Sequence, residues 1–129
     1  MQYAEKTKEI QHQLQILGHE AFPSKFIDEF IGLDDEQKEV LKLKQKYEND
    51  AIREHWNLIQ HSDAILVLNF DKHGIPGYIG GNSFLEMGFA YVLHKPIYLL
   101  NPIPHMPYYD SEIIAMKPTI INNDLTKIK

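Results

Sequence analysis

The sequence predicts an α/β protein whose parallel sheet has helices on both faces. Two short apolar runs, 64–68 and 96–100, are bounded by polar residues and lack alternation, which is typical of strands buried on both faces. Between them, 84–93 has helical spacing, and a strand–helix–strand order favours parallel pairing. We therefore expect 64–68 to be a central strand. A ligand should bind beyond the carboxyl ends of the strands.

The other expected elements follow from hydrophobic spacing and from glycine and proline. Ile10, Leu14 and Leu17 recur at helical spacing and predict a helix over 3–17, which Gly18 ends. The remaining expected elements are a short strand at 19–23, a long helix over 34–61 or two helices meeting near Asn49, loops at 71–77 and 101–107, a helix at 111–116 and a last strand at 119–121.

Length and composition favour an ordinary globular protein. The chain has 129 residues, 43% of them hydrophobic and 24% charged, which suits a single domain over 1–129. No apolar run reaches the roughly 18 residues of a spanning helix, and the chain does not begin with a signal pattern. We expect a cytoplasmic protein without a membrane partner.

Charge and side-chain chemistry narrow the function classes. With no cysteine, the chain has no disulfide, thiolate nucleophile or Cys-bound zinc. Its histidines show no pair at metal-ligand spacing, so we expect neither metal nor cofactor. A net charge of −5 does not suit a nucleic-acid polymer, and a small molecule is the expected partner.

Glu86 is the only carboxylate between Asp71 and Asp110. It follows the loop Gly80-Gly81-Asn82-Ser83, and glycines before a helix let backbone N–H groups approach a phosphate or a sugar hydroxyl. We therefore expect Gly80, Gly81, Asn82 and Ser83 to bind substrate. The alternative is a capping box in Ser83-Phe84-Leu85-Glu86, where Glu86 only bonds back to the Ser83 backbone. The residues alone leave both interpretations open.

Three segments carry a resemblance to a known family. In order they are Ser62–Asn69, Gly80–Ala90 and Lys95–Leu100. This order resembles the nucleoside 2-deoxyribosyltransferase superfamily and the related deoxynucleoside 5′-monophosphate N-glycosidases, in which a strand leads through a glycine-bearing loop to an E-x-G-x-A helix and a KPI strand. The resemblance implies a three-layer, Rossmann- or flavodoxin-like sheet. It also puts Glu86 at the position of the family's catalytic glutamate.

The implied chemistry is a two-step displacement at a sugar carbon. Glu86 would attack C1′ of a nucleoside or nucleoside 5′-monophosphate, and the glycosyl-enzyme would pass its sugar to another base or to water. A second group must protonate the departing base. His55 stands eight residues before Asp63, where relatives often carry an aspartate, and Asp71 ends the strand 64–68. The alternatives are a packing role for His55 and a turn-forming role for Asp71.

The start of the chain departs from the family. Relatives open with an apolar strand and a Gly-Ser-type turn, whereas this sequence begins at about the turn, so we expect the first strand to be missing or truncated. Tyr3 and Asn69 are expected to line the substrate site. The open position in the sheet favours pairing with another chain. Relatives also complete their sites across a dimer through the helix at 111–116. A homodimer or higher homo-oligomer is therefore expected, with Met116 near the neighbour's site.

Other interpretations remain open. Tyr108 and Tyr109 of the proline-rich loop could stack a base, or the loop could pack on its own sheet. The domain could bind nucleotides without catalysis. The segment Gly80–Glu86 is also similar to the GG-x-G-T-x-x-E loop of phosphoribohydrolases of the lysine-decarboxylase-like type, with Asn82 and Ser83 in place of Gly-Thr.

Overall fold

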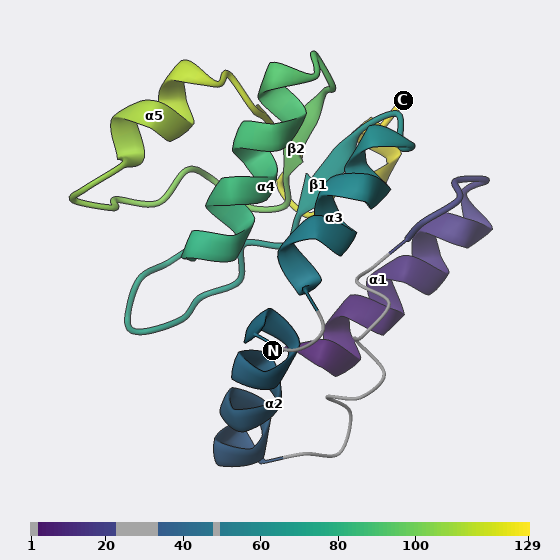
Figure 1. Ribbon diagram of the computed structural model, residues 1–129. Helices are drawn as coiled ribbons and strands as arrows, with labels where there is room; N and C mark the ends of the chain where they lie inside the picture. The colour runs from purple at the N-terminus through teal and green to yellow at the C-terminus, as the bar shows by residue number, and fades with distance from the viewer. Residues whose placement is uncertain (1–2, 23–33, 48–49) are drawn as a thin grey trace. The chain divides into compact units, whose positions relative to one another are not determined.

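The structure is a computed structural model that describes residues 3–22, 34–47 and 50–129. The chain divides into two compact units, Met1–His55 and Trp56–Lys129, and each is described by itself. Figure 1 shows the elements of both units. The single domain expected from the length stays a prediction.

The N-terminal unit contains the helices α1 (Ala4–Ile16) and α2 (Asp35–Tyr47). Leu41 packs against the fully buried Ala4, and the Lys38 ammonium lies 3.8 Å from the Glu5 carboxylate. Gly18 has a φ of +97°, and the His19 N–H donates to the Leu14 carbonyl at 3.0 Å. This bond and the left-handed Gly18 are features of the Schellman ending, which a glycine after the helix predicts.

Two of the expectations for the first half of the chain are decided by the described residues. The segment 34–61 forms two helices, α2 and α3 (Ala51–Gln60), and Asp50 before α3 has a φ of +51°. The break near Asn49 is therefore confirmed, although 48–49 lie outside the described residues. The strand expected at 19–23 is wrong over His19–Phe22, which has no regular structure, and Pro23 is not described.

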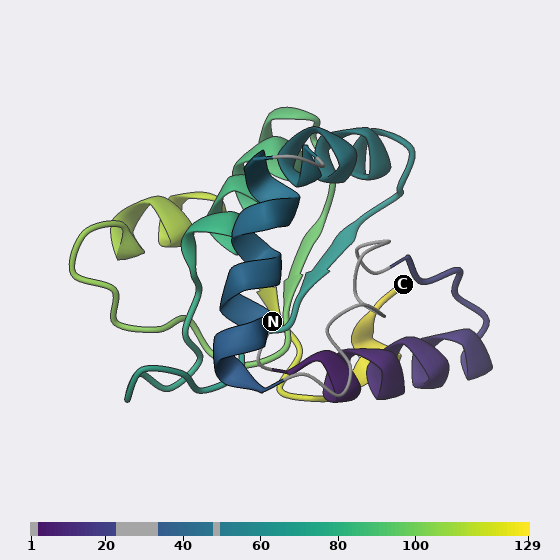
Figure 2. The ribbon, with the colours of Figure 1, turned by 60° about the horizontal axis from the view of Figure 1, so that its bottom comes forward.

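The C-terminal unit is built on a parallel sheet in the order β1-β2-β3. Its strands are β1 (Ile65–Val67), β2 (Ile97–Leu99) and β3 (Thr119–Ile120). Helix α4 (Gly81–Val92) connects β1 to β2, α5 (Asp110–Ala115) connects β2 to β3, and the short 3-10 helix η2 (Leu125–Lys127) follows. Figure 2 shows β1 and β2 side by side. The predicted α/β class with a parallel sheet is confirmed.

The position of β1 differs from the expectation. It lies at the edge of the three described strands, with β2 in the middle, whereas the apolar run 64–68 predicted a central strand. An apolar run reports that both faces of a strand are covered, but it does not report how many strands lie beside it. Three strands establish a parallel sheet and leave a three-layer arrangement as a prediction.

The core of the C-terminal unit lies where α4 packs against β1 and β2. Its buried members are Ile59, Val67, Ile79, Met87, Ala90, Ile97, Leu99, Met106 and Ile113. In the ranges that the structure describes, no helix is long and apolar enough to span a membrane.

Candidate functional site

Helix α4 begins earlier than its apolar spacing suggests. Gly80 is the cap residue, with extended φ and ψ of −80° and 175°, and no side chain caps it. The Phe84 N–H donates to the Gly80 carbonyl at 2.9 Å, so the helix starts at Gly81 rather than at Phe84. A capping box requires Ser83 itself to be the cap residue, and that interpretation is therefore wrong. The hydrophobic period missed the first turn because that turn holds only Gly81, Asn82 and Ser83.

Glu86 is the sixth residue of α4 and so belongs to its second turn, whereas a helix that began at Phe84 would have Glu86 in its first turn. It is half-buried and is the only charged residue of this helix. Met87 next to it is fully buried, and Phe89, three residues on, shares the flank of Glu86. The Phe89 ring meets the Trp56 ring of α3 edge-on at 5.1 Å. The carboxylate therefore stands at the border between the core and the surface.

The first turn of α4 offers backbone donors at the sheet's carboxyl side. The first N–H groups of a helix have no partner within it, and the helix field there favours an anion. Gly81 and Asn82 are exposed, while Gly80 and Ser83 are half-buried. A side chain at position 80 would place its Cβ 3.3 Å from the Tyr78 ring, which is tighter than ordinary contact, so glycine avoids a crowded contact with that ring.

The loop between β1 and α4 is ordered by its own hydrogen bonds. Lys72 and Ile75 exchange backbone bonds of 2.9 and 3.2 Å around His73 and Gly74, whose φ values of +53° and +71° suit a type I′ turn. Asp71 is exposed, and its Oδ1 accepts the Gly77 N–H at 2.9 Å. This contact supports the turn-forming role of Asp71. A role as proton donor stays a prediction.

Three asparagines tie together the carboxyl ends of the strands. Asn69 is 1% exposed; its Oδ1 accepts the Asn101 N–H at 2.9 Å, and its Nδ2 donates to the Asn101 carbonyl at 2.8 Å and to the Pro102 carbonyl at 3.2 Å. Asn101 in turn accepts from Asn123 Nδ2 at 2.7 Å. The Asn69 amide is thus engaged within the protein. Its expected contact with substrate stays a prediction.

A group of aromatic residues, of which Tyr78 was not expected, flanks the same loop. The Tyr109 hydroxyl donates to the Ile79 carbonyl at 2.6 Å, and its ring stacks on Phe84 with 4.5 Å between centroids. Burial, and then the charge that Tyr78 carries when ionised, raise the pKa of Tyr109 above its ordinary 10.0. These contacts support packing of the proline-rich loop on its own unit. In the sequence, Tyr78 is notable for its place two residues before Gly80. That place assigns Tyr78 to the loop but does not reveal which side chains it contacts.

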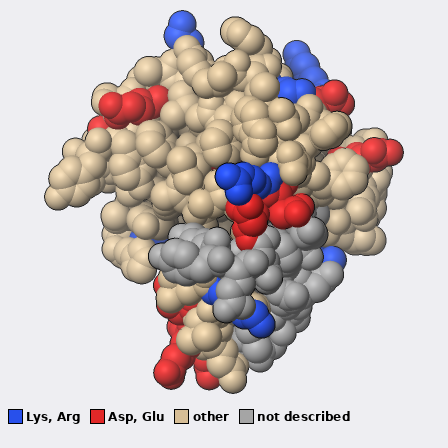
Figure 3. Space-filling model, in the orientation of Figure 1, with Lys and Arg blue, Asp and Glu red and all other residues tan. Residues whose placement is uncertain are grey.

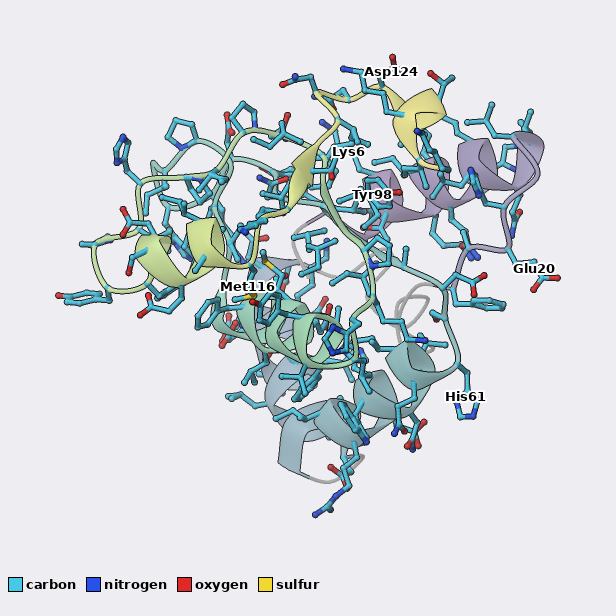
Figure 4. All side chains as sticks on the ribbon, turned by 90° about the horizontal axis from the view of Figure 1, so that it is seen from above. Lys6, Glu20, His61, Tyr98, Met116 and Asp124 are labelled. Atoms are coloured by element: carbon cyan, nitrogen blue, oxygen red, sulfur yellow. The ribbon has the colours of Figure 1, made fainter. Side chains whose placement is uncertain are left out.

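The remaining expected site residues are Met116, Tyr3 and His55. Met116 caps the end of α5 and packs against the core of the C-terminal unit (Figure 4). Tyr3, at the start of α1, and His55, in α3, are half-buried members of the N-terminal unit. Their expected places beside Glu86, which belongs to the C-terminal unit, stay predictions.

Comparison with known proteins adds no neighbour: no protein-family model, curated protein or solved structure matches the chain. Among the side chains that the structure describes, no three His, Asp or Glu residues gather as a metal site would require.

Proposed function

We propose that this protein transfers or hydrolyses the N-glycosidic bond of a nucleoside or nucleoside 5′-monophosphate, with Glu86 as nucleophile. The observation that carries the proposal is the start of α4 at Gly81, which removes the capping-box alternative for Glu86. The order of the three family-like segments supports the same chemistry. Membership of the nucleoside 2-deoxyribosyltransferase-like superfamily, with its three-layer sheet, is part of this proposal.

The environment of Glu86 suits a nucleophile. It is half-buried, its neighbour Met87 is fully buried, and α4 contains no second carboxylate that would compete for a proton. A nucleophilic carboxylate must be ionised, and partial removal of water strengthens its attack on a developing positive charge at C1′. The exposed first turn of α4 can hold a phosphate or sugar hydroxyl of the same substrate.

The reaction balances as two displacements. A Glu86 oxygen forms a bond to C1′ while the C1′–N bond breaks, and the electron pair of that bond goes to the base, which takes a proton from an acid. Water or the nitrogen of another base then attacks C1′ and releases Glu86. The candidate acids are His55 and Asp71. Asp71, in its turn-forming contact, already accepts one hydrogen bond.

The direct test is chromatography of free base after incubation with deoxy- and ribonucleosides and their 5′-monophosphates. We expect Glu86→Gln to lower base release by at least about a thousandfold, because the amide cannot form the glycosyl ester. Glu20→Gln is the matched control, since Glu20 is an exposed acid whose side chain points into solvent (Figure 4). Equal turnover by wild type and Glu86→Gln would refute the proposal. Saturable nucleotide binding without turnover would favour the non-catalytic alternative.

A further inference from the structure

Tyr109 contacts α4 on both sides of its first turn. Its hydroxyl donates to the Ile79 carbonyl at 2.6 Å, and Ile79 directly precedes the cap residue Gly80. Its ring stacks on Phe84, with 4.5 Å between centroids, and the Phe84 N–H closes the first turn by donating to the Gly80 carbonyl. One side chain, which comes from the start of α5, thus holds the chain just before and just after that turn.

The backbone of Tyr109 is itself held by the core. Its N–H donates to the Met106 carbonyl at 3.3 Å, and its carbonyl accepts the Ile113 N–H at 3.2 Å. Met106 and Ile113 are both buried members of the core of the C-terminal unit. The Tyr109 hydroxyl is therefore carried by a fixed backbone, and it can hold the start of α4 in place.

The start of α4 depends on this hydroxyl because glycine provides little restraint of its own. Gly80 lacks a side chain that would limit backbone rotation, and no described side chain caps the helix. Ile79 is fully buried and precedes the cap residue, so its carbonyl lies outside the hydrogen bonds of the helix and needs another partner. Without the hydroxyl, this carbonyl would stay unpaired, or the chain would rotate at Gly80 to reach water.

Glu86 lies between this hold and the buried part of the helix. It follows Gly80 by six residues, about 9 Å along the helix axis, and Met87 and Ala90 beyond it are buried. A rotation at the start of α4 would therefore tilt the turns that carry Glu86. Because a reacting group misplaced by about 1 Å can cost roughly a hundredfold in rate, even a smaller displacement of Glu86 would slow its attack.

No second carboxylate of α4 can take the place of a displaced Glu86. Glu86 is the only charged residue of this helix, and Figure 3 shows the surface over α4 almost free of charged side chains. The rate of the reaction should therefore depend on where α4 holds this one group.

We propose that Tyr109 is a positioning residue, whose hydroxyl fixes the start of α4 and so sets the approach of Glu86 to the sugar carbon. This inference rests on the proposed glycosyl chemistry, and it adds to that proposal a residue that acts through Glu86. A role in packing alone would need only the ring on Phe84, which phenylalanine supplies equally well.

The test is single-turnover release of base, with protein in excess over the nucleoside or 5′-monophosphate that wild type cleaves fastest. We expect Tyr109→Phe to lower the maximal rate constant by about tenfold or more and to change the half-saturating protein concentration by less than about twofold, because Glu86 acts in the transition state. Tyr108→Phe is the matched control: it removes a hydroxyl from the same loop, and Tyr108 is 91% exposed. It should leave both constants unchanged.

The two constants separate positioning from a purely structural role. A variant that only unfolds in part has fewer active molecules, so its half-saturating concentration rises while the rate constant of the folded molecules stays the same. Tyr109→Phe with the wild-type rate constant would overturn this inference alone, and so would an equal loss in Tyr108→Phe. If wild type releases no base, or Glu86→Gln releases it at the wild-type rate, the proposed function fails and this inference falls with it.

Discussion

Two glycines of the loop between β1 and α4 adopt left-handed backbone conformations for different reasons. Gly74 has a φ of +71° in the type I′ turn, and an added Cβ would meet nothing within 4 Å. Gly77 has a φ of +67°, and an added Cβ would lie 2.8 Å from the Pro102 carbonyl oxygen and 3.3 Å from Asn69 Nδ2. Gly77 thus joins the loop to the asparagine cluster, whereas Gly74 only turns the chain.

This difference predicts unequal effects of the same substitution. Gly74→Ala should lower the free energy of unfolding by about 1 kcal/mol, the usual strain of a left-handed alanine. Gly77→Ala should lower it by more than about 2 kcal/mol, because the backbone of Pro102 must also move. Urea unfolding of both variants measures the difference. Equal losses would contradict the close packing at Gly77.

The asparagine cluster shows where residue-scale prediction ends. The sequence placed Asn69 correctly after a strand and at the carboxyl edge of the sheet. It did not reveal the hydrogen bonds to Asn101, which is 32 residues away and follows the next strand. Partners that follow different parallel strands are far apart in the chain, and a local pattern around one residue does not reveal which residue of another strand's end will face it. A buried structural asparagine and a ligand-binding one therefore look alike in the sequence.

At the scale of the element, the start of α4 decides how Glu86 is interpreted. If Ser83 were a cap, Ser83→Ala would cost about 1 kcal/mol of stability. With Gly80 as the cap residue, Ser83 lies inside the helix, and we expect a change within about 0.5 kcal/mol. Chemical denaturation of wild type and Ser83→Ala distinguishes the two. A loss near 1 kcal/mol or more would restore the capping box.

The proline-rich loop is joined to the base of α4 by Tyr109. Its hydroxyl bonds to the Ile79 carbonyl, and Tyr109→Phe should cost about 1 kcal/mol at neutral pH while keeping the stack on Phe84. Because folding raises the pKa of Tyr109, its contribution is fully present below pH 10 and is lost as pH rises through the folded pKa. The stability difference between wild type and Tyr109→Phe should therefore shrink above about pH 10.

Urea unfolding across that range measures this effect. The neighbouring Tyr108→Phe is the control for removing a phenol hydroxyl from this loop, because Tyr108 is 91% exposed. A difference that is constant with pH would argue against the hydroxyl bond as the source of the stability.

Helices and strands with a strong hydrophobic period were predicted well. The residues at which they end, and the strands that lie beside them, were predicted less well. Helix α1 and the strands β1 and β2 appear where apolar spacing put them, because each buries a regular face. The first turn of α4 was missed because glycine and small polar residues carry no hydrophobic period. Among the strands that the structure describes, β1 lies at the edge, and this was missed because an apolar sequence reports what covers the two faces of a strand and not what lies beside it.

At the scale of the whole molecule, alternation of strands and helices was enough to predict the α/β class. The division into two units at residue 55 was not predicted, since the helical segment 51–60 runs across it without a change in composition. The division also separates the expected residues: Glu86 and Asp71 lie in one unit, and His55 and Tyr3 in the other. The proposed role of Glu86 as nucleophile therefore does not depend on how the two units are arranged.

Mass spectrometry tests the proposed covalent bond between Glu86 and the sugar most directly. Protein quenched during turnover of a deoxynucleoside 5′-monophosphate should gain the mass of one deoxyribosyl phosphate residue, carried by the peptide that contains Glu86. Glu86→Gln should gain none. An adduct on another residue, or base release by Glu86→Gln at the wild-type rate, would contradict the account.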